Sequence, residues 1–186
     1  MSNTSAYTTQ NSLLLKKLIK FYQDNDYLDV ILPIINGEGK MSLRLIDWFV
    51  TNYAKKNFIV YNIKGKSSQR RFKVYVDYKL KLKAYSKKRF DPFCRWERIT
   101  IPYDADNYIQ TTIGQLNFFK WVLENEILTY LENNFETIEK DMNRRNSTSK
   151  RKEKSNKKTR KKREELSISA SKSIKKEQVE IVVKFN

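Results

Sequence analysis

Between Arg71 and Tyr85, lysines and tyrosines alternate with apolar residues. If this segment is a β-strand, even-numbered side chains lie on one face and odd-numbered side chains on the other. The even face would then be apolar, and the odd face would carry Lys73, Tyr75, Lys79, Lys81 and Lys83. A basic face with aromatic rings can bind a nucleic acid, whereas lysines also keep exposed sheet edges from pairing with other chains. Both interpretations stay open from this segment alone.

A loop rich in basic and aromatic residues follows at residues 86–98, where Pro92 limits regular structure. Its large rings are Phe90, Phe93 and Trp96. They could stack on the bases of a single strand, or they could fill the core while the charges face water. In the first case, the phosphate-binding surface would be extended by Lys87, Lys88, Arg89, Arg95 and Arg98.

Residue types that usually perform catalysis or bind metals are scarce. The chain has no histidine and one cysteine, Cys94, so a zinc site and a histidine-assisted nucleophile are excluded. A Gly-Lys-Ser string begins at Gly65, but a predicted strand follows it where a phosphate-binding loop needs a helix. The carboxylates Asp47, Asp77 and Glu97 show no spacing typical of an acid–base pair. We therefore expect no enzymatic activity, no cofactor and no metal.

Charge is distributed unevenly along the 186 residues. The chain has 38 basic and 21 acidic residues, for a net charge of +17, which favours a polyanionic partner. Residues 64–98 carry 13 basic and 3 acidic groups, and residues 144–176 carry 15 and 3. No apolar stretch is long enough to span a bilayer, and residues 1–12 do not resemble a secretory signal.

The second basic region predicts a linker at 144–178 that is disordered, or transiently helical when bound, because it has too few apolar residues to offset the entropy of ordering. Such an arm can anchor nucleic acid electrostatically, act as a nuclear import signal, or only solubilise the chain. The residues expected to contact phosphate are Lys150, Arg151, Lys152, Lys157, Lys158, Arg160, Lys161, Lys162 and Arg163.

Residues 179–186 form an apolar, β-prone peptide after this linker. Its alternate residues are Val179, Ile181, Val183 and Phe185. The peptide either completes the sheet of the preceding domain or adds a strand to another protein, and we favour docking on a protein partner.

Hydrophobic spacing predicts an α+β domain at residues 11–143. In this prediction a small antiparallel sheet, with a hairpin at about 58–85, is packed by two or three amphipathic helices. Helices are expected after Ser12, after Ser42 (to about Lys56) and after Thr112, where Gln115 completes a capping box. Val30–Ile35, interrupted by a proline, is expected to be an edge strand or a buried extended linker. A further strand is expected at 99–103, and Asn133 and Asn134 are expected to interrupt the last helix.

Three segments resemble a known family: Ser42–Lys56, Arg89–Arg95 and Thr111–Trp121. Together they are similar to uncharacterised small proteins of large nucleocytoplasmic DNA viruses, the giant viruses of the mimivirus and phycodnavirus kind. The resemblance covers about residues 12–143. It implies a viral origin and a location inside the infected cell, in cytoplasm, nucleus or virion, and it assigns no catalytic or binding residue.

The sequence as a whole favours a non-enzymatic protein that binds DNA or RNA through a basic sheet face and a polybasic arm. The alternative is a virion or scaffold protein that docks a protein partner through residues 179–186.

Overall fold

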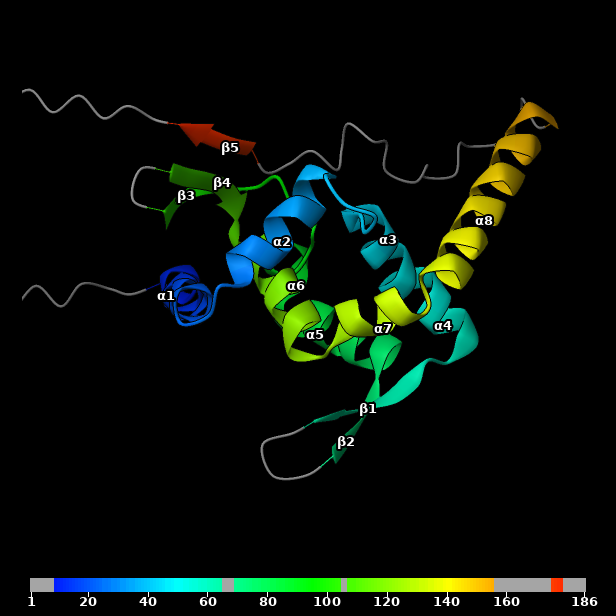
Figure 1. The fold of residues 1–186 in the computed structure, drawn as a ribbon, viewed down its shortest axis with the longest axis horizontal. Helices are drawn as coiled ribbons and strands as arrows, with labels where there is room; N and C mark the ends of the chain where they lie inside the picture. The colour runs from blue at the N-terminus through cyan, green and yellow to red at the C-terminus, as the bar shows by residue number, and fades with distance from the viewer. Residues whose placement is uncertain (1–8, 65–68, 105–106, 156–174, 179–186) are drawn as a thin grey trace, which may run out of the picture.

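The computed structural model of the chain describes residues 9–64, 69–104, 107–155 and 175–178. It is an α+β fold in which short helices surround a buried central helix, α6, and two small antiparallel sheets lie at its edges (Figure 1). The helices are α1 (Gln10–Gln23), α2 (Tyr27–Asn36), α3 (Leu43–Trp48), the π-helix η1 (Phe49–Tyr53), α4 (Ala54–Asn57), α5 (Val74–Arg89), α6 (Ile113–Glu124), α7 (Ile127–Asn133) and α8 (Phe135–Ser155). The strands are β1 (Val60–Lys64), β2 (Gln69–Lys73), β3 (Arg98–Asp104), β4 (Asn107–Thr112) and β5 (Lys175–Gln178).

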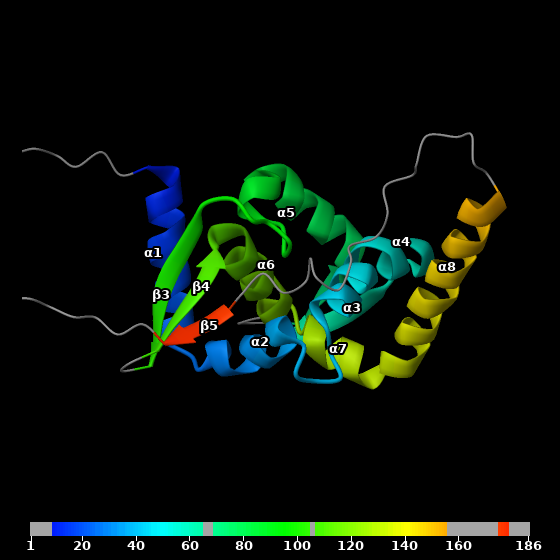
Figure 2. The same cartoon turned by 90° about the horizontal axis from the view of Figure 1, so that it is seen from above.

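The central helix α6 begins where the sequence predicts, since the Thr112 hydroxyl accepts a hydrogen bond from the Gln115 amide at 3.2 Å. Every residue from Ile113 to Phe119 is buried, so the first two turns of this helix are covered on all sides, whereas Glu124 in its last turn is exposed. Helices α1, α5 and α7 pack against it, and Figure 2 shows α5 and α6 side by side. The side-chain amide of Gln115 makes a further contact, since its Nε2 donates to the Pro92 carbonyl at 3.0 Å.

The long basic strand predicted at residues 71–85 is wrong: β2 ends at Lys73 and α5 follows at once. β1 begins at Val60, which pairs with Lys73, so β1 has no residue to pair with a longer β2. Val74 and Tyr78 are both buried. Their four-residue spacing places them on one face of a strand and equally on one side of a helix. The decisive residues are Val76 and Leu80, which alternation assigns to the core and which are 52% and 60% exposed.

The predicted strand at Val30–Ile35 is also wrong, because these residues belong to α2, with Pro33 inside the helix. A proline removes one backbone donor, but burial of Ile31, Leu32, Ile34 and Ile35 favours the helix. Gly37 then ends α2 in the left-handed conformation (φ 73°), and its amide donates to the Pro33 carbonyl.

The helix expected after Ser12 begins at Gln10, with Thr9 as its cap, and the helix expected after Thr112 is also interrupted at Asn125 and Glu126. The remaining expected elements are confirmed. The Ser42 hydroxyl accepts from the Leu45 amide at 3.2 Å and begins α3, which continues through η1 to Asn57. β3 pairs with β4, and the helical segment is interrupted between α7 and α8 at Asn133 and Asn134.

The C-terminal part differs from the predicted boundaries. The domain end expected at residue 143 lies inside α8, and residues 144–155, expected to be disordered, continue that helix to Ser155. β5 then pairs antiparallel with β4, Gln110 opposite Lys175 and Asn107 opposite Gln178, as the third strand of the β3–β4–β5 sheet. Residues 156–174 and 179–186 lie outside the described residues, so the predictions made for them stay predictions.

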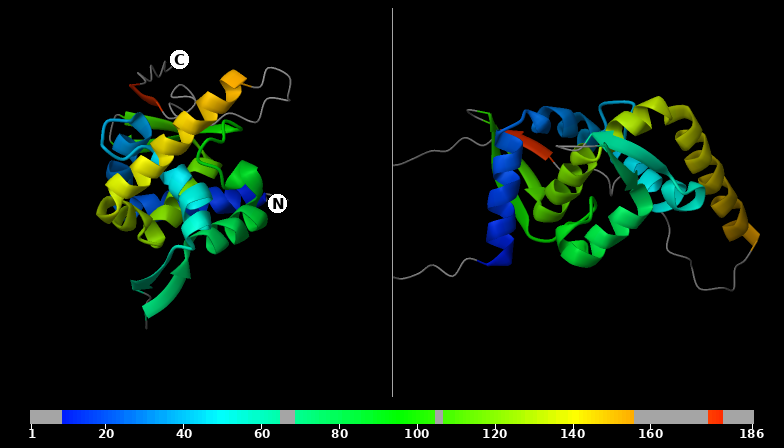
Figure 3. Two further views of the ribbon diagram at one scale, coloured as in Figure 1. Left: turned by 90° about the vertical axis from the view of Figure 1, so that its right-hand side faces the viewer. Right: turned by 90° about the horizontal axis from the view of Figure 1, so that it is seen from below.

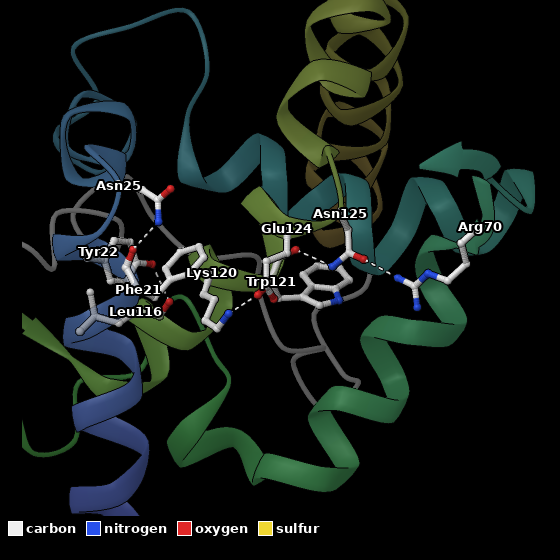
Figure 4. A network of polar contacts seen from close by, with 9 residues as sticks. All are labelled: Phe21, Tyr22, Asn25, Arg70, Leu116, Lys120, Trp121, Glu124 and Asn125. Atoms are coloured by element: carbon white, nitrogen blue, oxygen red, sulfur yellow. Dashed lines mark hydrogen bonds and ion pairs between the residues drawn. The ribbon is translucent and has the colours of Figure 1, made fainter. Parts of the chain in front are cut away.

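Polar contacts at the two ends of α6 fix its neighbours (Figure 4). At one end, the Tyr22 hydroxyl of α1 donates to the Leu116 carbonyl at 2.7 Å. At the other, Asn125 Nδ2 donates to the Trp121 carbonyl at 2.7 Å, while its Oδ1 accepts from Arg70 at 3.0 Å. Arg70 pairs with Ile63 near the loop end of the β1–β2 hairpin, so this bond connects that end to α6. The hairpin projects from the helical body (Figure 3).

At Gly114, α6 packs closely on the 88–94 segment. A β-carbon at this position would lie 3.0 Å from the Lys88 carbonyl oxygen and 3.3 Å from that of Asp91. Gly114→Ala should therefore lower the free energy of unfolding by about 1–3 kcal/mol, the usual cost of overpacking. Urea denaturation measures it, with Gly39→Ala as control, where Met41 N, at 4.0 Å, is the nearest atom. Equal stability of the two variants would contradict the close approach.

Buried tyrosines should make the fold less stable at high pH. Burial raises the pKa of Tyr22, Tyr61 and Tyr78 above 10.0, with nearby carboxylates adding to the effect. Since the unfolded state loses these protons first, this contribution to stability is complete below pH about 10 and is lost as the pH rises. Ultraviolet absorbance of the native chain at pH about 11 should show fewer than all 11 tyrosines ionised, with the rest ionising on unfolding in urea. Complete ionisation of the folded chain at that pH would disprove it.

Candidate nucleic-acid interface

The solvent side of α5 carries a row of basic residues. Trp121 Nε1 donates to Asp77 Oδ1 at 2.6 Å, and Tyr78 is buried beside Trp121, so one side of α5 is fixed against α6. Residues four apart on a helix share a side, and the residues of the opposite row are Tyr75, Lys79 and Lys83, while Lys87 follows a break in the helix at Ser86. The three lysines are exposed, and within the described part of the chain none of them is in an ion pair. Lys81 lies off this row and is half-buried.

The hairpin continues this basic surface beyond the start of α5. Phe72 is buried and packs on Tyr61, which places its neighbours Arg71 and Lys73 on the outer face of β2. Both are exposed. Because Lys73 immediately precedes α5, the outer face of the hairpin and the helix supply cations in succession.

A break in α5 at Ser86 redirects the chain. Ser86 has φ 63° and ψ 167°, a conformation that costs a non-glycine residue energy. After the break, Lys88 Nζ lies 4.5 Å from the centroid of the Trp96 ring, and that ring is 58% exposed. Arg95 beside it is exposed as well. A cation over a solvent-facing ring is a feature that nucleic-acid binders use for stacking.

The other two rings of the loop point to the second alternative, in which the rings fill the core. Phe90 is fully buried and packs on Tyr78, Phe118 and Trp121, while Phe93 is half-buried.

Arg89 and Arg98 are held by the protein itself. Arg89 Nε donates to Asn11 Oδ1 at 2.7 Å and its Nη1 donates to Gln10 at 3.1 Å, which ties the end of α5 to the start of α1. Arg98 Nη1 donates to Gln110 at 2.6 Å across the β3–β4 pair, although its side chain remains exposed. We therefore remove Arg89 from the candidate interface and keep Arg98 at its margin.

Cations of α4 and α8, absent from the sequence-based site, extend the surface. Lys55 Nζ lies 5.7 Å from the centroid of the Tyr75 ring, at the head of the α5 row. Lys56 Nζ lies 3.9 Å from Asp141, whose carboxylate also accepts from Arg144 at 3.1 Å.

Arg145 Nε also lies 3.3 Å from Asp141, so this carboxylate, only 9% exposed, serves three cations and leaves a net positive charge. The signal in the sequence was modest: a lysine pair in the last turn of a helix, and two arginines three and four residues after an aspartate. Their meeting in space depends on the packing of α8 on α3 and η1.

These residues together are called the basic track. Its members are Lys55, Lys56, Arg71, Lys73, Lys79, Lys83, Lys87, Lys88, Arg95, Trp96, Arg98, Arg144 and Arg145. Lys150, Arg151 and Lys152 lie further along the backbone of α8. The other predicted contacts, Lys157, Lys158, Arg160, Lys161, Lys162, Arg163, Val179, Ile181, Val183 and Phe185, lie outside the described residues.

Other candidate sites are weaker. Among residues 9–64, 69–104, 107–155 and 175–178, no group of three histidine, cysteine, aspartate or glutamate residues could hold a metal ion, and no helix there is long and apolar enough to cross a membrane. An open groove of about 780 Å³ between α2, α7 and α8 is lined by Val30, Pro33, Met41, Leu128 and Phe135, with Glu132 and Glu136 among its charged residues. Those carboxylates make it a poor site for a polyanion.

Fold and surface together define an α+β protein built on one buried helix and presenting a track of cations to solvent. The chain belongs to the family described as "Family of unknown function (DUF7197)", which it matches over residues 2–185. It is 44% identical over 158 residues to an uncharacterised protein (L507) of Acanthamoeba polyphaga mimivirus, an alignment that covers 82% of this chain and 60% of that protein. The chain thus spans less than two thirds of that relative's length, and the resemblance to giant-virus proteins is confirmed. No solved structure matches it.

The different roles of Arg89 and Lys87 can be separated by stability. Arg89→Gln removes two hydrogen bonds to α1 and should lower the free energy of unfolding by about 1–2 kcal/mol. Lys87→Gln removes the same charge from an exposed position and should change it by less than about 0.5 kcal/mol. Urea denaturation of both variants measures the difference, and equal values would mean that the bonds of Arg89 do not secure α1.

Proposed function

We propose that this protein binds nucleic acid through the basic track and catalyses no reaction on it. The observation that carries the proposal is a set of three exposed ammonium groups of α5 with no acidic partner among the described residues. Lys79 and Lys83 are about 6 Å apart along the helix axis, and Lys87 follows the break at Ser86. Lysines on a solvated helix usually alternate with acids, which neutralise them. Here the nearby acid Asp77 lies on the other side of the helix and accepts from Trp121.

The aromatic part of the track supports the same function. Trp96 offers an exposed ring with Lys88 on one face, and stacking of a base on such a ring contributes about 1–3 kcal/mol. Hydrogen bonds fix the loop around it: the Phe93 amide donates to Asp91 at 2.8 Å, and Thr112 donates to the Cys94 carbonyl at 3.3 Å. A fixed ring loses little entropy on binding.

Given the giant-virus relationship, we propose that the protein acts inside the infected cell, in the cytoplasm or nucleus, or within the virion. DNA and RNA are both compatible with the charges of α5, since phosphate contacts carry no sequence information.

A second candidate function is docking of a protein partner through residues 179–186, as in a virion or scaffold protein. One observation favours it: Gln178 is paired with Asn107, the first residue of β4. β4 therefore offers no residue with which a continuation of β5 beyond Gln178 could pair. A partner's sheet edge would supply what β4 lacks.

The primary proposal is tested by binding of a labelled oligonucleotide over a salt series. We expect the full chain to bind at about 100 mM salt. The combined variant Lys79→Gln, Lys83→Gln, Lys87→Gln should bind at least about tenfold more weakly, and its plot of log affinity against log salt should be shallower by about 2–3 units. A control of equal charge, Lys16→Gln, Lys17→Gln, Lys20→Gln on α1, should keep most of the affinity, since its lysines lie outside the track.

Two results would contradict the proposal. One is absence of binding by the full chain near 100 mM salt. The other is an equal loss of affinity in the α5 variant and the α1 control, which would show that net charge alone, and not the α5 row, determines binding.

A further inference from the structure

Helix α8 is longer than its packing requires. Ile138 and Met142 are its buried apolar residues, and Arg145 lies over the Trp48 ring at 5.5 Å. The helix nevertheless continues to Ser155, and Figures 1 and 2 show its last turns standing clear of the other helices, at the end of the molecule opposite the β3–β4–β5 sheet. The projecting part contains Lys150, Arg151, Lys152 and Lys154 with a single acid, Glu153.

We propose that the last turns of α8 enter the major groove of double-stranded DNA, an inference that rests on the proposed nucleic-acid binding and names the form of its ligand. An α-helix with side chains is about 10–12 Å across, and the major groove of B-form DNA is about 12 Å wide. Four of the five residues 150–154 are cations, and phosphates flank the groove on both sides. The major groove of duplex RNA is deep and narrow and admits no such helix.

The base of the projecting segment is fixed, so the helix is presented in one direction. Asp141 contacts Arg144, Arg145 and Lys56, which connects α8 to α4 just before the helix leaves the body. Lys56 then lies at the base of the projecting segment, where phosphates beside an occupied groove would come closest. Phosphate contacts of this kind set the position of a recognition helix on the duplex.

The segment between base and tip is built of weak helix formers: Asn146, Ser147, Thr148 and Ser149. Helix stability at 146–155 therefore limits the affinity for a groove, whereas it hardly affects contacts with a flexible single strand. This difference separates duplex binding from general attraction to phosphate, and it can be changed without altering any charge.

The test compares three full-length proteins with the same net charge on three ligands. The proteins are the natural chain, a helix-breaking variant (Thr148→Pro) and a helix-favouring variant (Ser147→Ala, Thr148→Ala, Ser149→Ala). The ligands are a DNA duplex, an RNA duplex of the same sequence and one of the DNA strands alone. Thermal unfolding of each protein verifies that the body of the fold is intact.

We expect the natural chain to bind the DNA duplex at least about tenfold more tightly than the RNA duplex, because only the former has an accessible major groove. Thr148→Pro should weaken binding to the DNA duplex by about tenfold or more and to the single strand by less than about twofold. The helix-favouring variant should tighten duplex binding by up to about tenfold, since three weak helix formers become alanine.

Equal affinity of the natural chain for the two duplexes, or an unchanged affinity of Thr148→Pro for duplex DNA, overturns the groove proposal. Neither outcome contradicts the proposed function, provided that the Lys79→Gln, Lys83→Gln, Lys87→Gln variant binds nucleic acid more weakly than the natural chain. Tighter binding of the single strand than of the DNA duplex also overturns the groove proposal, and it would assign recognition to Trp96. Failure of the natural chain to bind any of the three ligands ends both proposals.

Discussion

Burial of the first two turns of α6 on all sides is the constraint on which the rest of the structure depends. Its apolar and aromatic residues require a neighbour in every direction, and α1, α5, α7, the 88–94 segment and β4 supply them. The polar groups at its ends then fix those neighbours through hydrogen bonds such as Tyr22 to Leu116 and Trp121 to Asp77. Once Val74 and Tyr78 pack inward, the lysines of α5 face water. The basic surface is thus a consequence of how the core is filled.

The placement of acids completes the electrostatic character of that surface. Asp77 accepts from Trp121, Glu97 accepts from Asn11 at 3.2 Å, and Glu124 pairs with Lys120 on α6. Asp141 organises three cations at the junction of α4 and α8 without neutralising them. Exposed cations therefore occur on the hairpin, α5, α4 and α8, and the proposed binding of a long polyanion rests on this distribution.

Much of the fold could be predicted from local signals in the sequence, whereas its arrangement could not. Side-chain caps at Ser42 and Thr112 identified two helices, because a capping hydroxyl acts within three residues. The alternation of apolar and polar residues after Lys73 predicts a strand, and only the length of β1 and the position of α6 favour the helix. Exposure of Trp96 beside burial of Phe90, and the meeting of Lys56 with Asp141, depend on tertiary packing that no local pattern reveals.

The central claim is that nucleic acid contacts the face formed by α4, α5 and α8. Hydrogen exchange of the full chain, measured with and without a DNA duplex at about 100 mM salt, tests it most directly. We predict slower exchange in residues 54–57, 74–98 and 144–155 and unchanged exchange in α2 and α7. Slower exchange in α2 and α7, with α5 unaffected, would contradict the account.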